Sequence, residues 1–168
     1  DKAGACTPRT CAPGHISTVE GATSADANCT PCQPGTYAEG GAATQCEPMQ
    51  CPAGQAGTTT GATSGTDGCT FCPVGTHSVG GEGTCLETAC APGHIATLEG
   101  ATGEVDGCTP CAPGTFSLGG AALLCEPLAC PPGQASDRTA ATHANDGCTP
   151  CAIGTFSEGG PAAVCHPI

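Results

Sequence analysis

The residues with the most chemistry to offer are the cysteines, which number 17 in a chain of 168 residues. A cysteine can form a disulfide, hold a metal ion as a thiolate or act as a redox-active thiol. From Cys6 onwards the steps between successive cysteines are 5, 18, 3 and 14 residues, and this series occurs four times with a single change of 14 to 13. Such regular spacing indicates selected pairing and predicts a disulfide-bonded repeat protein.

Each period of 39–40 residues has a long half and a short half, and both halves begin Cys-x-x-Gly. We expect each half to be a loop closed by its own first and last cysteine, worth about 3 kcal/mol per loop in the chain-entropy model. Four cysteines per repeat allow three connectivities, so spacing alone leaves a crossed pattern open. The expected bonds are Cys11–Cys29, Cys32–Cys46, Cys51–Cys69, Cys72–Cys85, Cys90–Cys108, Cys111–Cys125, Cys130–Cys148 and Cys151–Cys165.

Two other cysteine chemistries are alternative interpretations. Cys29-x-x-Cys32 with Cys46 and Cys51 offers four thiolates to zinc, but zinc modules of this kind usually carry Lys and Arg, which are scarce here. A redox-active Cys-x-x-Cys needs a helix that lowers a thiol pKa, whereas this motif recurs between Gly and Pro turns. We therefore expect structural disulfides, with no metal ion and no cofactor.

Cys6 makes the cysteine count odd. Its spacing to Cys11 makes it the equivalent of the cysteines that close short halves, so its partner is expected outside this sequence. At the other end, residues 166–168 resemble the Glu-Pro-hydrophobe linkers between repeats. The hypothesis is that this chain is a window on a longer array, or that Cys6 pairs with another chain.

The remaining polar residues form no catalytic pattern in the sequence. The histidines occupy unlike repeat positions except for one pair, so we expect solvated or packing side chains. An Asp before the closing cysteine is explained by an Asp-Gly turn without calcium. Because no Ser-His-Asp arrangement and no phosphate-cradling loop are present, we expect no enzyme. The histidines are His15, His77, His94, His143 and His166.

Two kinds of glycosylation site are candidates. Asn28-Cys29-Thr30 is an N-glycosylation sequon, and an unmodified turn asparagine beside a bonded cysteine is the alternative. The run Thr58, Thr59 and Thr60 fits O-glycosylation of a secreted stalk, and bare solvated threonines are the alternative.

The elements that position these residues must fold without a conventional core. Gly, Pro and Cys number 27, 16 and 17, more than a third of the chain, whereas Val, Ile, Leu, Met, Phe and Tyr together number 20. Burying one large side chain stabilises by roughly 1.5–3 kcal/mol, while ordering each residue costs about 1.5 kcal/mol. Apolar burial therefore cannot order the chain, and the disulfides must supply the difference.

The charge balance excludes several partners. The net charge is −12, and the only basic residues are Lys2, Arg9 and Arg138. Phosphate backbones need clustered Lys and Arg, so we expect no nucleic-acid partner. The longest apolar run is far shorter than the ~20 residues that span a bilayer, so we expect no direct membrane insertion.

The predicted fold class is small disulfide-rich repeats: irregular short β-hairpins in an elongated rod, with almost no helix. The glycine of each Cys-x-x-Gly suits a turn with positive φ, the Thr-aromatic step after it begins a short strand, and a Gly-Gly pair turns the chain back. The expected divisions are residues 1–10 (end of a preceding repeat), 11–50 (repeat 1), 51–89 (repeat 2), 90–129 (repeat 3) and 130–168 (repeat 4).

One repeat position is aromatic. Tyr37, Phe116 and Phe156 occupy it, with His77 as the fourth member. We expect each to cap its own hairpin and pack on a disulfide, and a periodic stripe for contact with another copy is the alternative.

The short halves carry a motif that resembles a known family. Residues 29–46, 108–125 and 148–165 share Cys-Thr-Pro-Cys-x-x-Gly-Thr-[Tyr/Phe]-x-x-Gly-Gly-x-x-x-x-Cys, and repeat 2 departs from it at Phe71 and His77. The motif resembles ephrin-receptor-like cysteine-rich repeats, related to tumour-necrosis-factor-receptor-like modules. Similar arrays occur in surface and flagellar-hair (mastigoneme-like) proteins of unicellular eukaryotes. The resemblance covers nearly the whole chain and implies an elongated extracellular rod, but no ligand.

The function favoured by these features is structural. We expect an extracellular protein, secreted or at the cell surface, whose disulfide-stapled repeat rod forms part of a coat, stalk or filament. Its expected partners are other copies of itself or further repeats of the same chain, and glycans are a further candidate. The alternative is a receptor-type ectodomain that binds a protein ligand along the rod, for which Phe71 and His77 are the only hint.

Overall fold

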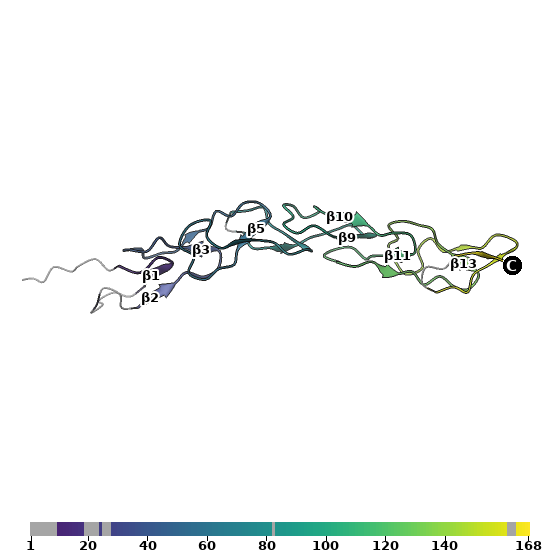
Figure 1. Cartoon of the computed structure of the whole chain (residues 1–168), viewed down its shortest axis with the longest axis horizontal. Helices are drawn as coiled ribbons and strands as arrows, with labels where there is room; N and C mark the ends of the chain where they lie inside the picture. The colour runs from purple at the N-terminus through teal and green to yellow at the C-terminus, as the bar shows by residue number, and fades with distance from the viewer. Residues whose placement is uncertain (1–9, 19–23, 25–27, 82, 161–163) are drawn as a thin grey trace, which may run out of the picture. The chain divides into compact units, whose positions relative to one another are not determined.

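The computed structural model describes residues 10–18, 24, 28–81, 83–160 and 164–168. Regular secondary structure in these residues consists of sixteen strands of two or three residues, without any helix (Figure 1). A helix long and apolar enough to cross a membrane is accordingly not found in this part of the chain. The strands are β1 (His15–Ser17), β2 (Cys29–Pro31), β3 (Thr36–Tyr37), β4 (Glu47–Pro48), β5 (Gln55–Gly57), β6 (Cys69–Phe71), β7 (Thr76–His77), β8 (Leu86–Glu87), β9 (His94–Ala96), β10 (Cys108–Pro110), β11 (Thr115–Phe116), β12 (Glu126–Pro127), β13 (Gln134–Ala135), β14 (Thr149–Pro150), β15 (Thr155–Phe156) and β16 (His166–Pro167).

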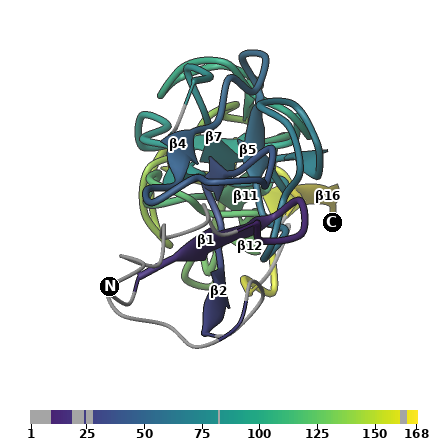
Figure 2. The ribbon, with the colours of Figure 1, turned by 90° about the vertical axis from the view of Figure 1, so that its left-hand side faces the viewer.

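Each of these strands pairs antiparallel with one other strand, which gives eight two-stranded sheets in the described residues. In a long half, the first strand follows the Cys-x-x-Gly turn and its partner begins at the closing cysteine or next to it. In the first such pair, β1 and β2 (labelled in Figure 2), His15 lies opposite Pro31 and Ser17 opposite Cys29. Each long half is therefore a single hairpin.

The short halves pair their strands in a way that corrects the sequence analysis. The Thr-aromatic strand β3 pairs with β4, which follows the closing cysteine, so that Tyr37 lies opposite Glu47. The Glu-Pro-hydrophobe segments are thus the second strands of the short-half hairpins and do more than link the repeats. The same register occurs in β7–β8, β11–β12 and β15–β16.

The turns predicted at the Cys-x-x-Gly glycines are confirmed. All eight of these glycines have φ between 80° and 88°. A left-handed backbone costs a residue with a Cβ roughly 1–2 kcal/mol, which explains why glycine recurs at this position. The glycines are Gly14, Gly35, Gly54, Gly75, Gly93, Gly114, Gly133 and Gly154.

Backbone hydrogen bonds join the two halves of each repeat. Cys11 N donates to Gly41 O, and Gly41 N donates to Cys11 O, both at 2.8 Å. Gly41 is the second glycine of the Gly-Gly turn, so this turn of the short half docks on the opening cysteine of the long half. Equivalent bridges occur at Cys51–Gly81, Cys90–Gly120 and Cys130–Gly160.

The chain divides into two compact units. The first contains the residues up to Cys72 and Ser78–Cys85, and the second contains Pro73–His77 and Leu86–Ile168. Each unit has a small cluster of buried apolar side chains, as expected for a chain with few large apolar residues. The clusters are Met49, Cys51 and Ala62 in the first unit and Phe116, Leu128 and Ala141 in the second.

Candidate functional site

Eight disulfide bonds recur at regular positions along the described part of the chain. Each joins the first and last cysteine of one half-repeat, with Cα atoms 5.5–5.8 Å apart. The cysteines that a zinc site would need are all in these bonds, which contradicts the zinc alternative. Cys6, whose partner was expected outside the sequence, lies outside the described residues. The bonds are Cys11–Cys29, Cys32–Cys46, Cys51–Cys69, Cys72–Cys85, Cys90–Cys108, Cys111–Cys125, Cys130–Cys148 and Cys151–Cys165.

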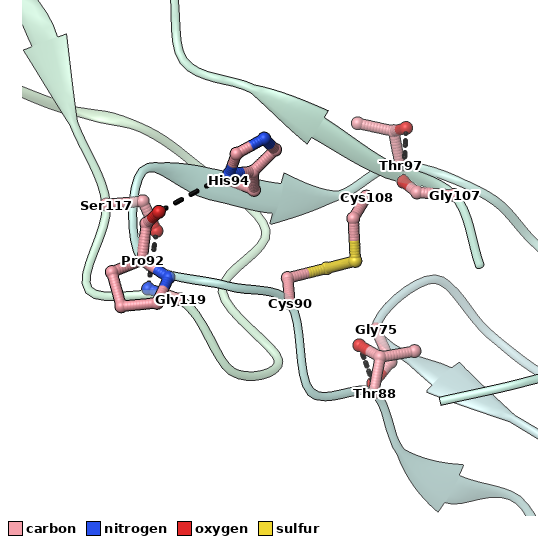
Figure 3. The surroundings of a disulfide bond; sticks show 10 residues. All are labelled: Gly75, Thr88, Cys90, Pro92, His94, Thr97, Gly107, Cys108, Ser117 and Gly119. Carbon is pink, nitrogen blue, oxygen red and sulfur yellow. Dashed lines mark hydrogen bonds between the residues drawn. A yellow bond between two sulfur atoms is a disulfide. The ribbon is translucent and has the colours of Figure 1, made fainter. Parts of the chain in front are cut away.

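Hydroxyl groups hold the backbone around the Cys90–Cys108 disulfide, as Figure 3 shows. Thr97 Oγ1 donates to Gly107 O at 2.9 Å across the long-half hairpin. Ser117 Oγ accepts a bond of 3.0 Å from Gly119 N in the Gly-Gly turn. Such local bonds satisfy the polar groups of loops that have little regular secondary structure.

The histidines do not converge on a common site. His94 Nδ1 lies 3.3 Å from Pro92 O, and His15 Nδ1 lies 3.2 Å from Pro13 O, so this repeated pair makes local contacts (Figure 3). In the part of the chain that the structure describes, no group of three or more His, Cys, Asp or Glu side chains is arranged to hold a metal ion.

Successive repeats contact each other through one recurring surface, which we call the junction. At the junction between repeats 3 and 4, Phe116 forms a parallel bridge with Ala141, and Ser117 N donates to Ala141 O at 3.1 Å. Leu128 follows β12 and completes the apolar cluster. Phe116 is 8% exposed and Leu128 is 1% exposed. Two more backbone bonds close this junction, from Ala140 N to Cys111 O at 2.9 Å and from Ala129 N to Ala144 O at 2.6 Å.

The junction between repeats 1 and 2 uses the equivalent residues. Tyr37 forms the parallel bridge with Ala62, and Met49 takes the place of Leu128 in the buried cluster. The Tyr37 hydroxyl donates to Glu47 Oε2 at 2.8 Å, and this bond is the main cause that raises the Tyr37 pKa. The backbone bonds are also equivalent, from Gly61 N to Cys32 O at 2.7 Å and from Gln50 N to Gly65 O at 2.6 Å.

The junction between repeats 2 and 3 has the same parallel bridge and one of the same backbone bonds, and its side chains differ. His77 forms the parallel bridge with Ala101, and Thr88 stands where the other junctions have Met or Leu. Thr88 Oγ1 donates to Gly75 O at 3.1 Å (Figure 3). His77 is 9% exposed, and its Nδ1 is buried without a hydrogen-bond partner among the described residues. Ala89 N donates to Glu104 O at 2.7 Å, as at the other junctions.

The junctions correct the interpretation of the aromatic position. Tyr37 and Phe116 pack in clusters with an alanine of the next repeat, and His77 forms the equivalent bridge with Ala101, so these residues do not simply cap their own hairpins. Phe156 is 45% exposed and lies 6.0 Å from the ring of His166. Of the two residues that hinted at a receptor-type ectodomain, Phe71 is 62% exposed and His77 is buried.

Sequence reasoning missed the other two residues of each junction. Met49 and Leu128 stand in the Glu-Pro-hydrophobe segments, which the sequence suggests are linkers, and Ala62 and Ala141 lie in loops to which the sequence assigns no role. A signal was available, because an Ala-Thr pair recurs at one position of every long half, and in repeats 2, 3 and 4 its alanine is the junction residue. Small size at this alanine permits the close backbone approach of a parallel bridge.

Three carboxylates clamp the long-half turns. Asp106 Oδ2 accepts bonds from the Thr102 hydroxyl and the Thr102 backbone N–H. The hydroxyl bond is the largest cause that lowers the Asp106 pKa. The Asp-Gly steps thus end a longer hairpin connection, where the Asp side chain folds back onto a threonine. The other two clamps are Asp67 with Thr63 and Asp146 with Thr142, and in each the backbone bond from the threonine is the main cause of a lowered pKa.

The glycosylation candidates are all exposed. Asn28 and Thr30 of the sequon, and the run Thr58, Thr59 and Thr60, all present accessible side chains. Asn28 has φ of 60° and stands where the other repeats have a glycine of positive φ. Because asparagine tolerates this conformation best after glycine, the turn itself accounts for an asparagine at this position, whether or not it is modified.

Regular disulfide loops, short hairpins and recurring junctions together define the class: a tandem array of small disulfide-rich hairpin repeats. No model of a known protein family matches the chain, and no curated protein matches it. The class therefore rests on the spacing and geometry of the chain itself.

Proposed function

We propose that this chain is an extracellular structural protein, a disulfide-stapled repeat array that forms part of a surface coat, stalk or filament. The observation that carries the proposal is the junction that recurs between successive repeats. In repeat arrays, each unit is stabilised mainly by its neighbours, and contacts between neighbours propagate one geometry along the chain. An array of this kind is suited to span or cover a distance.

The redox chemistry of the chain supports a location outside the cytosol. Sixteen of the 17 cysteines are in disulfides, which persist in oxidising compartments and are rare where glutathione and thioredoxin keep thiols reduced. The resemblance of the short-half motif to ephrin-receptor-like and tumour-necrosis-factor-receptor-like repeats, and to flagellar-hair proteins, supports a cell-surface or secreted protein. The array acts in this proposal without catalysis and without a cofactor.

The proposed partners are other copies of the chain or further repeats. Phe156 occupies the same position as Phe116, yet it is 45% exposed where Phe116 is 8% exposed. The loop of a neighbouring repeat, with an alanine at the bridge position, would cover Phe156 as Ala141 covers Phe116. Glycans on Asn28 or the Thr58–Thr60 run would add bulk to such an array.

Assembly tests the structural role directly. Native protein with intact disulfides, examined by light scattering and negative-stain microscopy, is expected to form filaments or higher oligomers. Phe156→Glu is expected to weaken assembly, because it places a charge on the face that a neighbouring repeat covers. Phe71→Glu, on an aromatic that is 62% exposed outside the junctions, is the matched control. Monomers in both measurements, or equal effects of the two variants, would refute assembly through this face.

Location is tested separately. An antibody against the chain is expected to label intact, unpermeabilised cells or to detect the protein in the medium. Label that appears only after permeabilisation would contradict the extracellular assignment, whatever the outcome of the assembly experiment.

A receptor-type ectodomain is the second candidate function. The observation in its favour is an apolar groove in repeat 3, whose equivalent in repeat 1 is polar.

A further inference from the structure

Repeat 3 contains an open groove with a mostly apolar lining. It has a volume of about 290 Å³, and Leu118, Leu124 and Glu126 line it together with Phe116 and Ala122. Leu118 is 75% exposed and Leu124 is 80% exposed. Two exposed leucines beside a hollow form a surface that can bury a further apolar side chain.

The equivalent groove of repeat 1 shows that the fold does not require these leucines. That groove has a volume of about 340 Å³ and is lined by Glu39, Gln45 and Glu47. Glu39 and Gln45 hold the repeat positions of Leu118 and Leu124. Because the same backbone forms a groove with polar side chains in one repeat, the apolar lining in repeat 3 is explained by neither the hairpin nor the disulfide.

The glutamate beside each groove also differs between the two repeats, in whether its carboxylate has a hydrogen-bond partner. In repeat 1, Glu47 accepts the hydroxyl of Tyr37 at 2.8 Å. In repeat 3, Glu126 lies opposite Phe116, which has no hydroxyl to donate. Glu126 makes no side-chain hydrogen bond and no ion pair with any residue that the structure describes. Repeat 3 thus places a free carboxylate next to two exposed leucines.

We propose that this groove binds a segment of another protein in which a large apolar side chain stands next to a lysine or arginine. The apolar side chain lies against Leu118 and Leu124, and the cation pairs with Glu126. A basic segment also complements the chain as a whole, which has a net charge of −12 and no lysine or arginine between positions 10 and 137. The inference goes beyond the structural role and does not depend on it.

Charge and the openness of the groove argue against two other occupants. At this groove a second copy of the chain has little to offer Glu126, since it contains only three basic residues and Arg138 is already paired with Asp146 at 3.2 Å. An independent small ligand is disfavoured because a pocket for one encloses most of the ligand's surface. This groove is open, which suits a side chain of a peptide.

The test is a selection with a library of random 12-residue peptides displayed on phage, performed on the full chain with intact disulfides. Leu118→Glu/Leu124→Gln, which installs the residues of repeat 1, serves for counter-selection. The enriched peptides are expected to share a large apolar residue within two positions of Lys or Arg. Synthetic versions are expected to lose at least tenfold in affinity for the double variant. Glu126→Gln is expected to lower affinity about threefold and to reduce its salt dependence.

The matched control is Val164→Gln, which changes an exposed residue at the repeat-4 position equivalent to Leu124 and should leave affinity unchanged. The proposal is overturned if no peptide is enriched, if enriched peptides lack basic residues, or if they bind the double variant as tightly as the parent. It is also overturned if sedimentation shows a dimer of the parent chain that the double variant does not form, because a second copy would then be the occupant.

Discussion

Two junctions within the second unit share a backbone and differ in their side chains. At one, Phe116 and Leu128 are buried against Ala141; at the other, His77 and Thr88 hold the same positions near Ala101. Both have the parallel bridge. In both, the residue after Leu128 or Thr88 donates a backbone hydrogen bond to the long-half loop of the next repeat. Only the second has a buried nitrogen without a partner, at His77 Nδ1.

The backbone determines where a junction forms, and the side chains determine how stable it is. Backbone hydrogen bonds and a small alanine determine where repeats meet, and they are common to both junctions. Burying Phe116 and Leu128 stabilises by roughly 1.5–3 kcal/mol for each side chain. Leaving a buried donor or acceptor unpaired costs about 1–3 kcal/mol. The His77 junction is therefore the weaker of the two.

The largest loss of stability is expected when the apolar junction is disrupted. Phe116→Ala removes a side chain that is 8% exposed and leaves a cavity, which costs about 3–5 kcal/mol. Hydrogen exchange at the Ser117 amide, which donates to Ala141 O, should accelerate by about 10² or more. His77→Ala should accelerate exchange at the Ala89 amide much less, because it also removes an unpaired nitrogen. Equal acceleration at both junctions would contradict the ranking.

A glycine pair tests the close approach on which the junctions depend. Gly93 has φ of 83° and a methyl group there would overlap the carbonyl of Ala140, whereas Gly133 has φ of 81° and open space. Gly133→Ala should cost only the left-handed conformation, about 1–2 kcal/mol. Gly93→Ala should cost a further 1–3 kcal/mol or so from overpacking. Denaturant unfolding of both variants measures the difference, and equal stability would show that the contact is dispensable.

The reverse change gives the His77 junction the side chains of the apolar junction. His77→Phe/Thr88→Leu copies the apolar junction and removes the unpaired nitrogen, so it should stabilise by about 1–2 kcal/mol. Exchange at the Ala89 amide should slow about tenfold, while exchange at Ser117 should not change. Faster exchange at Ala89 would mean that the site lacks room for the larger side chains.

The smallest expected effect concerns the acid that lies beside the polar junction. The Thr102 hydroxyl is the main cause that lowers the Asp106 pKa, and the charge of His77 is the last contribution. Because the folded pKa is below the unfolded value of about 3.9, the stabilisation is complete above that value and is lost as pH falls through the folded pKa. Thr102→Val should therefore raise the Asp106 pKa.

A carboxyl ¹³C titration by NMR measures this shift. Asp67, whose clamp with Thr63 is untouched by Thr102→Val, is the internal control and should keep its lowered pKa. An Asp106 titration that is the same with and without the Thr102 hydroxyl would remove the clamp as the cause.

The sequence predicted the local structure of this protein well, for a physical reason. Cysteine spacing, the Cys-x-x-Gly turns and the Gly-Gly turns are restrictions on short stretches of chain, and glycine is favoured where the backbone is left-handed, as at Gly93. The short-half hairpins were less visible. Tyr37 pairs with Glu47 across a closing cysteine, and a pattern of two-residue strands is too short to show periodicity.

The candidate groove was not predictable in the same way. Leu118 and Leu124 are separated by the Gly-Gly turn, and only the folded loop brings them to one hollow. Among the described residues, Glu126 has no hydrogen-bond partner because the residue opposite it is a phenylalanine, whereas Glu47 of repeat 1 lies opposite a tyrosine.

By itself, the sequence determined the repeat, its two halves, the turns and the absence of a large core, because each follows from composition or from spacing along the chain. The tertiary structure decided among the three disulfide connectivities and assigned the aromatic position to the junctions. It also revealed Met49, Leu128 and Ala141 as the buried residues that join repeats. These contacts join residues 12 or more positions apart, and their side chains are small or isolated in the sequence, so only the folded backbone brings them together.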